Sequence, residues 1–172
     1  AMRFVGPIRK ELGMKTFFNM LGPILNPAQV QKQLTGVYNQ EILGIYGELF
    51  QKTEGNFGVL FGLDGYDEIS LTSNFELITK RGKETISPEQ LGFTKCKQED
   101  LHGGNNVQES AKILIAILEN KGTKAQTEVV LANAATALYC ADDDLSLLDA
   151  VLRAKESLIS GKALNSFRKF IQ

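Results

Sequence analysis

Cysteine and histidine are scarce in this sequence of 172 residues. Its two cysteines, Cys96 and Cys140, lie far apart without CxxC spacing, and His102 is the single histidine. Disulfide frameworks and zinc sites need closely spaced sets of these residues, so neither is expected, and a reduced, cytoplasmic setting is the default. A catalytic Cys-His or Ser-His pair would have to use His102. Because no other feature supports such a pair, we interpret it as a loop histidine.

The sequence also lacks an excess of either charge and any long apolar run. It has 19 basic and 20 acidic residues, for a net charge of -1. Proteins that bind nucleic acids or membrane surfaces through charge carry a basic excess, so neither partner is expected. No apolar run approaches the roughly 20 residues that span a bilayer. No charged-then-apolar signal segment opens the chain.

The residues that are present have an ordinary globular composition, with 43% hydrophobic and 23% charged residues. The length suits one domain, which would bury roughly 70% of the surface that the unfolded chain exposes. Residues 33–39 are expected to form a strand, and residues 40–54 a helix with its apolar residues at helical spacing. The continuous apolar run that follows, from residue 56, is typical of a parallel strand covered by helices on both faces. These three elements predict a βαβ unit and hence an α/β fold.

Further helices are expected before and after this unit. Apolar spacing predicts a helix over 2–12 and one or two short helices within 17–25. A strand pair with a turn at 80–83 is expected to lead into a short helix that begins at Ser87 and Pro88. Four longer helices are then predicted, over 106–120, 127–141, 146–161 and 162–171. The helix at 127–141 is apolar on nearly all sides, which predicts that it is buried.

The stretch "FGLDGYDEIS", residues 61–70, combines the end of the second strand with an adjacent acid pair, Asp67 and Glu68. Mg²⁺ binds oxygen ligands, typically one or two carboxylates together with substrate phosphates. Open α/β sheets bind ligands at the carboxyl ends of their strands, where this pair is expected to lie. The alternative is a polar turn, with Asp64 in an Asx-turn beside Gly65. Local sequence favours the turn and leaves the metal site open.

Three other features carry a functional and a structural interpretation. The loop "HGGNN" could offer backbone N–H groups to an anion at the start of a helix, or be only a tight loop. Arg9 could bind a substrate carboxylate through two hydrogen bonds if its helix borders a cleft, or lie in solvent. The small residues of "NAATALY", 133–139, favour close helix packing in a core.

Several stretches, taken together, resemble the anthranilate phosphoribosyltransferase family. They occur in family order and cover nearly the whole chain. The stretches are "VGPIRKELGMKTFFNMLGPILNPA" (5–28), "QLTGVYNQEIL" (33–43), "DGYDEIS" (64–70), "LHGG" (101–104), "VVLANAATALYCA" (129–141) and "SGKAL" (160–164). The block around "FNMLGPILNP" and the acid pair are the most specific of these.

The resemblance implies a function in tryptophan biosynthesis. The family transfers a phosphoribosyl group from phosphoribosyl pyrophosphate to the amine of anthranilate, with Mg²⁺, and releases pyrophosphate. By resemblance, Asp67 and Glu68 hold Mg²⁺, and Arg9 contacts the carboxylate of anthranilate. Met2 and Gly6 match positions that line the anthranilate channel, although the family commonly has alanine where this chain has Gly6.

The family's "GTGGD" pyrophosphate loop and its "KHGN" segment do not occur in this sequence. The chain therefore resembles the C-terminal portion of the enzyme, and alone it is expected to be inactive. Residues 1–31 would supply two helices of a small helical domain and the hinge. Residues 32–172 would form the C-terminal part of a mostly parallel sheet flanked by helices. The family forms homodimers through the small helical domain.

Two other functions stay open at this point. A pyrimidine-nucleoside phosphorylase would share the fold but not the motif "NMLGPILNP". A non-enzymatic, nucleic-acid-binding relative would be expected to carry a basic face, which a net charge of -1 disfavours.

Overall fold

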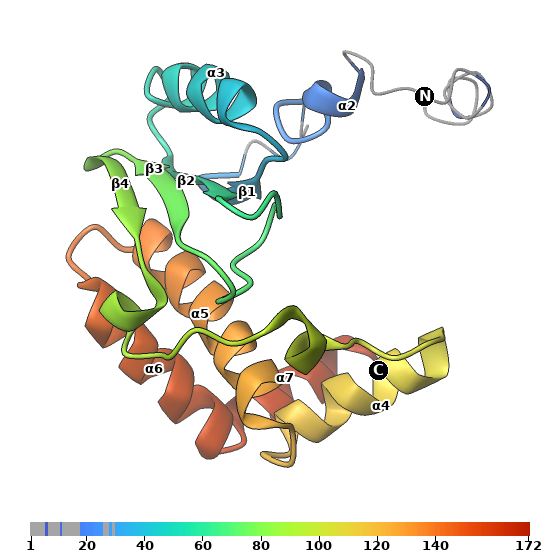
Figure 1. Cartoon of the computed structure of the whole chain (residues 1–172). Coiled ribbons are helices and arrows are strands. Elements are labelled where there is room, and N and C mark those ends of the chain that lie inside the picture. The colour runs from blue at the N-terminus through green and yellow to red at the C-terminus, as the bar shows by residue number, and fades with distance from the viewer. Residues whose placement is uncertain (1–5, 7–10, 12–17, 26–27, 29) are drawn as a thin grey trace. The chain divides into compact units, whose positions relative to one another are not determined.

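The computed structural model describes residues 6, 11, 18–25, 28 and 30–172 of the chain (Figure 1). The chain divides into two compact units, Ala1–Val30 and Gln31–Gln172, and each is described by itself. In the first unit a short helix, α2 (Phe18–Leu21), lies within the range where short helices are expected. Most of the helix expected over 2–12 lies outside the described residues. The assignment of residues 1–31 to a small helical domain and hinge stays a prediction.

The second unit is built around a four-stranded sheet in the order β1-β2-β3-β4. Its strands are β1 (Lys32–Gly36), β2 (Asn56–Gly62), β3 (Phe75–Thr79) and β4 (Gly82–Ile86). β1 and β2 are parallel and are connected by α3 (Gln40–Phe50), so the predicted βαβ unit and the α/β class are confirmed.

The other two pairings correct the expectation of a mostly parallel sheet for these four strands. β2 pairs with β3, and β3 with β4, in antiparallel register. Only the two residues Lys80 and Arg81 separate β3 from β4. Parallel neighbours need a crossover of a dozen or more residues, so a connection this short permits only a hairpin. The expected strand pair with its turn at 80–83 is confirmed.

Helices lie on both sides of the sheet, as the apolar run of β2 predicts. α3 packs against β2 on one side, and α5 (Lys124–Ala141) packs against β1 and β2 on the other (Figure 1). Gly58 of β2 allows α5 to approach closely, because a Cβ there would lie 2.3 Å from Sγ of Cys140. Burial raises the pKa of the Cys140 thiol to about 12, so this cysteine is a neutral core residue.

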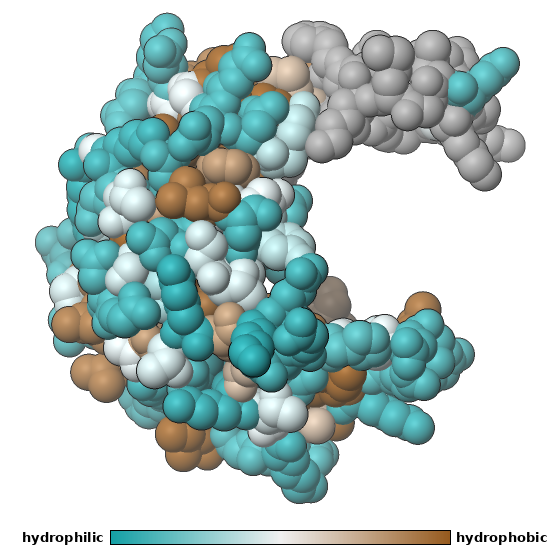
Figure 2. All heavy atoms as spheres, viewed as in Figure 1, coloured by the Kyte–Doolittle hydropathy of each residue, from teal (hydrophilic) through white to brown (hydrophobic). Residues whose placement is uncertain are grey.

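The remaining elements complete the helical layer. They are the 3₁₀ helices η1 (Pro88–Leu91) and η2 (Gln98–Leu101), and the helices α4 (Val107–Leu118), α6 (Leu147–Ile159) and α7 (Lys162–Phe170). Side chains of the sheet, η1, α5 and α6 share one apolar core. The face of residues 31–172 seen in Figure 2 is mostly hydrophilic, with apolar side chains in small separate groups. No helix in the described part of the chain is long and apolar enough to cross a membrane.

Two helix predictions need correction. α5 begins three residues earlier than the apolar pattern suggests, because Thr123 and Gln126 form a capping box that starts it. The expectation that this helix is buried all round is also wrong. Its side towards the sheet and α6 is buried, whereas Val130 and Leu138 are each 37% exposed. The short helix at Ser87 and Pro88 is present as η1, with Ser87 at its N-cap.

Candidate functional site

The acid pair lies in the loop of residues 63–74, between β2 and β3, at the carboxyl end of the parallel strand pair. Asp67 and Glu68 are both exposed. The base of the loop is closed by two backbone hydrogen bonds, from Gly62 N–H to the Tyr66 carbonyl at 2.8 Å and from Leu63 N–H to the Asn74 carbonyl at 2.9 Å. The loop therefore begins as a compact turn that presents both carboxylates outside the sheet edge.

Asp64 has a different task from the acid pair. Its Oδ2 accepts hydrogen bonds from the hydroxyls of Ser70, at 2.6 Å, and of Thr72. Ser70 Oγ also accepts from the backbone N–H of Thr72 at 3.1 Å. A backbone turn is present at Asp64 and Gly65, with Gly65 N–H donating to the Gly62 carbonyl. The Asp64 carboxylate, expected in an Asx-turn, instead bonds Ser70 and Thr72 and so ties the two arms of the loop together.

The end of β1 packs directly against the backbone of the acid pair. A Cβ at Gly36 would lie 1.6 Å from the carbonyl oxygen of Asp67, a distance that no side chain tolerates. Only glycine permits this approach. The backbone of Asp67 therefore rests on the last residue of β1.

A second contact holds the loop just after the acid pair. Asn133 of α5 accepts a hydrogen bond from Ile69 N–H at 3.0 Å and donates one to the Ile69 carbonyl at 2.8 Å. The close packing predicted for residues 133–139 is correct for Ala135 and Thr136, which are fully buried. The role of Asn133 has no local signal in the sequence, because its partner lies 64 residues away.

The donor set fits a magnesium ion that is completed by a substrate. Within the described residues, no group of three or more His, Cys, Asp or Glu side chains could hold a metal without help. Mg²⁺ retains several waters and usually takes one or two carboxylates together with substrate phosphates. Asp67 and Glu68 are adjacent, exposed and carried on a supported backbone, so they could supply that protein share.

Two cavities border the segment that leads from η1 to α4. One, of about 500 Å³, adjoins the acid pair. Its lining includes Tyr66, Glu68 and Gln98, and Gln98 Nε2 donates to the Tyr66 hydroxyl at 2.6 Å. Glu68 thus lines a hollow that polar and apolar residues share.

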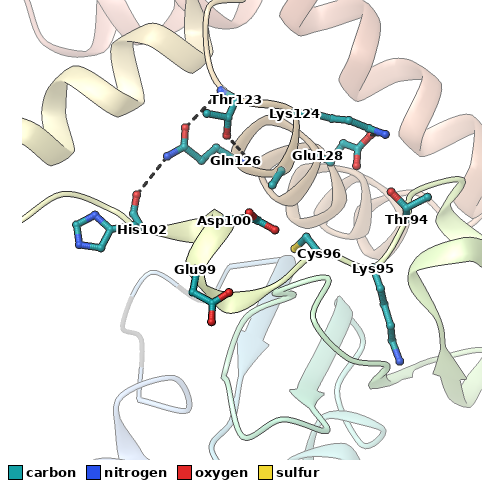
Figure 3. Close-up of a pocket in the computed structure, with 11 residues that line it drawn as sticks. Thr94, Lys95, Cys96, Glu99, Asp100, His102, Thr123, Lys124, Gln126 and Glu128 are labelled. Atoms are coloured by element: carbon teal, nitrogen blue, oxygen red, sulfur yellow. Dashed lines mark hydrogen bonds and ion pairs between the residues drawn. The ribbon is translucent and has the colours of Figure 1, made fainter.

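The other cavity, of about 590 Å³, lies between residues 94–102 and the start of α5 (Figure 3). Cys96 is part of its lining, and desolvation raises the pKa of that thiol. The carbonyl of His102 accepts a hydrogen bond from Gln126 Nε2 at 3.2 Å, and its Nδ1 accepts one from Gly104 N–H. His102 is exposed in a loop, as the sequence predicts.

The glycine loop before α4, residues 102–106, is a tight loop that forms hydrogen bonds with the first turn of that helix. Asn106 caps the helix by accepting from Glu109 N–H at 3.0 Å, and Glu109 in turn accepts from the backbone N–H of Asn105 at 2.8 Å. The Asn105 hydrogen bond, followed by that of the Asn106 side chain, lowers the pKa of the Glu109 carboxyl. A carboxylate of the chain thus already occupies one backbone donor of this loop, which supports the structural interpretation of "HGGNN".

The residues expected at an anthranilate site belong to the first unit. Met2 and Arg9 lie outside the described residues. Gly6 is exposed, and a Cβ built on it would meet no described atom within 4 Å. The roles of these three residues stay predictions.

The fold and the acidic loop define an α/β domain whose acid pair lies at the sheet edge where such domains bind their ligands. Comparison with known families identifies the group more closely. Residues 1–164 match the family described as "Glycosyl transferase family, a/b domain", and the chain belongs to that family.

Curated relatives agree with this assignment. Over 172 residues the chain is 45% identical to the anthranilate phosphoribosyltransferase of Cytophaga hutchinsonii, which covers 100% of this chain and 52% of the relative. Over 169 residues it is 48% identical to that of Flavobacterium johnsoniae, covering 98% of this chain and 51% of the relative. The chain thus spans about half the length of the curated relatives it matches.

Solved structures give the same result. The anthranilate phosphoribosyltransferase of Thermus thermophilus is similar with a TM-score of 0.90 and 30% identity, over 99% of this chain and 51% of that one. The enzyme from Saccharomyces cerevisiae, in complex with PRPP and Mg, is similar with a TM-score of 0.89 and 27% identity, over 99% of this chain and 49% of that one.

Proposed function

We propose that this chain is the C-terminal portion of an anthranilate phosphoribosyltransferase and supplies the carboxylates that hold its Mg²⁺. The observation that carries the proposal is the acidic loop: Asp67 and Glu68 are exposed, adjacent and braced at the carboxyl end of a parallel strand pair. The S. cerevisiae relative, described with PRPP and Mg, supports both the metal and the phosphate-bearing substrate.

The chemistry expected of such a site is mainly electrostatic. A bound Mg²⁺ would offset the negative charge that develops on pyrophosphate as the bond to the ribose breaks. The part played by this chain is to present two carboxylates on a backbone that does not have to reorganise when the ion and substrate arrive. Preorganised charge of this kind is worth more than the same groups on a mobile loop.

The acceptor side of the reaction would involve the first unit. In the proposal, Arg9 binds the carboxylate of anthranilate with its planar guanidinium, and Met2 and Gly6 line the path by which anthranilate enters. The S. cerevisiae relative in complex with 4-fluoroanthranilate supports a site for an aromatic carboxylate in this family. Homodimer formation and a cytoplasmic location remain predictions, since the relatives' names bear on neither.

The relatives' names favour this function over the two alternatives. The curated relatives and solved structures reported above are all anthranilate phosphoribosyltransferases, over nearly the whole of this chain. None of these observations favours a nucleoside phosphorylase or a nucleic-acid-binding protein.

The test is turnover in a completed enzyme. The half of the Cytophaga hutchinsonii relative that this chain does not cover, which the proposal takes to be its N-terminal half, would be joined ahead of Ala1. Anthranilate fluorescence would then be followed with PRPP and Mg²⁺. We expect the fluorescence to fall. In the same protein, Asp67→Asn with Glu68→Gln should lower the Mg²⁺-dependent rate on the order of a hundredfold or more.

A matched control separates this effect from a general loss of negative charge. Asp143→Asn with Asp144→Asn also removes two adjacent exposed carboxylates, but in the turn between α5 and α6. It should leave the rate within about twofold, as expected for surface changes that cost little. An Asp67 and Glu68 double variant with unchanged Mg²⁺ dependence would contradict the metal role.

A further inference from the structure

We propose that Asn133 is a positioning residue for the acid pair: its side-chain amide fixes the backbone of Ile69 and thereby the neighbouring carboxylates of Asp67 and Glu68. The inference rests on the proposed Mg²⁺ role of that pair and adds a residue on another element, α5, to the site. Within the stretch 133–139, Asn133 is the residue whose side chain bonds the backbone of the acidic loop.

The contact pattern is specific to an amide side chain. Asn133 Oδ1 accepts from Ile69 N–H at 3.0 Å while Nδ2 donates to the Ile69 carbonyl at 2.8 Å. The primary amide of Asn or Gln carries an acceptor and a donor on one planar group, so it can pair with both polar groups of one residue as a neighbouring strand would. Because Ile69 N–H can only donate, the orientation of the amide is fixed.

The Asn133 side chain is itself anchored to its own helix. Nδ2 also donates to the carbonyl of Val129, one turn earlier, at 2.9 Å. The side chain is therefore held between the backbone of α5 and the backbone of the loop. A group tied at both ends transmits the position of the helix to the loop.

The rest of the loop backbone is held in the same region. Ile69 and Leu71 are each only 1% exposed and belong to the apolar core. The Leu71 carbonyl accepts from Cys96 N–H at 3.1 Å. Leu71 has a φ of 60°, which is uncommon for a residue with a bulky side chain, and burial and this hydrogen bond hold it there.

The acid pair thus lies between two fixed points of backbone. Gly36 supports the carbonyl of Asp67 on one side, and Asn133 holds Ile69, directly after Glu68, on the other. The two carboxylates remain exposed, whereas the backbone that carries them is held in place. Residues that orient metal ligands in this way typically change metal affinity about 10- to 100-fold when they are removed.

The experiment uses the 172-residue chain and Mn²⁺, which takes the same carboxylate ligands as Mg²⁺ and broadens nearby NMR signals. Two quantities are measured: the exchange rate of the Ile69 amide hydrogen, and the Mn²⁺ concentration that half-broadens the amide signals of Asp67 and Glu68. The test variant is Asn133→Ser, whose hydroxyl can still bond the Val129 carbonyl within the helix but is too short to reach Ile69.

The control is Thr136→Val on the same helix. Thr136 is fully buried and donates only to the carbonyl of Ala132 within α5, at 2.9 Å, so its loss weakens the helix without touching the loop. We expect Asn133→Ser to raise Ile69 exchange about tenfold or more and to raise the Mn²⁺ midpoint about tenfold. Thr136→Val should leave both unchanged apart from any effect of overall stability.

The outcomes separate this inference from the proposed function. If the unsubstituted chain binds Mn²⁺ at Asp67 and Glu68 and Asn133→Ser binds it equally well, the positioning role is wrong and the metal role stands. If Mn²⁺ broadens only other acidic residues, such as Asp142–Asp144, the metal role falls and the inference with it. A third measurement needs no variant and compares the exchange rates of the Ile69 and Asp67 amide hydrogens. If Ile69 exchanges as fast as the exposed Asp67, the hydrogen bonds between Asn133 and Ile69 do not exist in solution, and the proposal is overturned.

Discussion

Gly36 ends β1 at the point where the backbone of Asp67 crosses it. Replacement by alanine would place a Cβ 1.6 Å from the Asp67 carbonyl oxygen, so either the strand end or the loop has to move. We expect Gly36→Ala to lower the free energy of unfolding by about 3 kcal/mol, near the upper end of the usual cost of overpacking. Denaturant unfolding of the 172-residue chain measures this.

Gly44 provides the matched control for that substitution. It lies on the exposed side of α3, and a Cβ there would meet no described atom within 4 Å. Gly44→Ala should therefore stabilise the chain by up to about 1 kcal/mol, because alanine is the better helix former. If both variants were equally stable, the close contact between β1 and the acidic loop would be refuted.

Residue-scale prediction from sequence depends on whether the signal is local. The position of Asp67 and Glu68 after an apolar strand could be read directly, because the apolar run and the two acids lie within one stretch. The division of labour in the loop could not be read, since Asp64 has the same chemistry as its neighbours and differs only in having Ser70 and Thr72 as partners. The Asn133 contact depends on tertiary packing and leaves no pattern in the sequence.

Arg81, at the tip of the β3–β4 hairpin, joins that hairpin to the end of α5. Its guanidinium donates to the carbonyls of Asp142, Asp143 and Leu145, at 2.8, 2.7 and 3.2 Å. It also lies 4.0 Å from the centre of the Tyr139 ring. The last carbonyls of a helix have no partner within the helix, so one planar cation satisfies several acceptors near this end.

Arg81→Lys is expected to lower the free energy of unfolding by about 1–2 kcal/mol, since an ammonium group cannot reproduce the fork that bonds several carbonyls at once. Arg153→Lys is the control, because Arg153 makes an exposed ion pair with Asp142 at 3.3 Å, and exposed pairs contribute about 0–1 kcal/mol. Thermal or denaturant unfolding compares the two. Equal losses would show that the hairpin is not fastened through Arg81.

At the scale of elements, the order of helices and strands follows from the sequence, but strand pairing does so only in part. The βαβ unit was predictable because a strand-forming stretch, a segment with helical spacing and a continuous apolar run follow one another there. The antiparallel pairing of β3 with β2 depends on the path of the loop at 63–74. The sequence of that loop does not by itself determine this path. The start of α5 at Lys124 was missed because apolar spacing begins later than the polar capping box at Thr123 and Gln126.

At the scale of the whole molecule, the proposed function gives this chain one part of a larger site. It spans about half the length of its relatives, and the family's "GTGGD" and "KHGN" segments are not in its sequence. The acid pair by itself offers two carboxylates and no group that would bind pyrophosphate directly. Mg²⁺ sites of this kind are completed by substrate phosphates that other parts of the protein must position.

We therefore expect the 172-residue chain alone to show no turnover of anthranilate with PRPP and Mg²⁺, measured by fluorescence. The enzyme completed with the relative's N-terminal half should turn over under the same conditions, which shows that the assay works. Circular dichroism and a cooperative unfolding transition of the isolated chain would exclude misfolding as the cause. Turnover by the chain alone would contradict the division of the site, because it would mean that these residues hold and activate pyrophosphate without the missing loops.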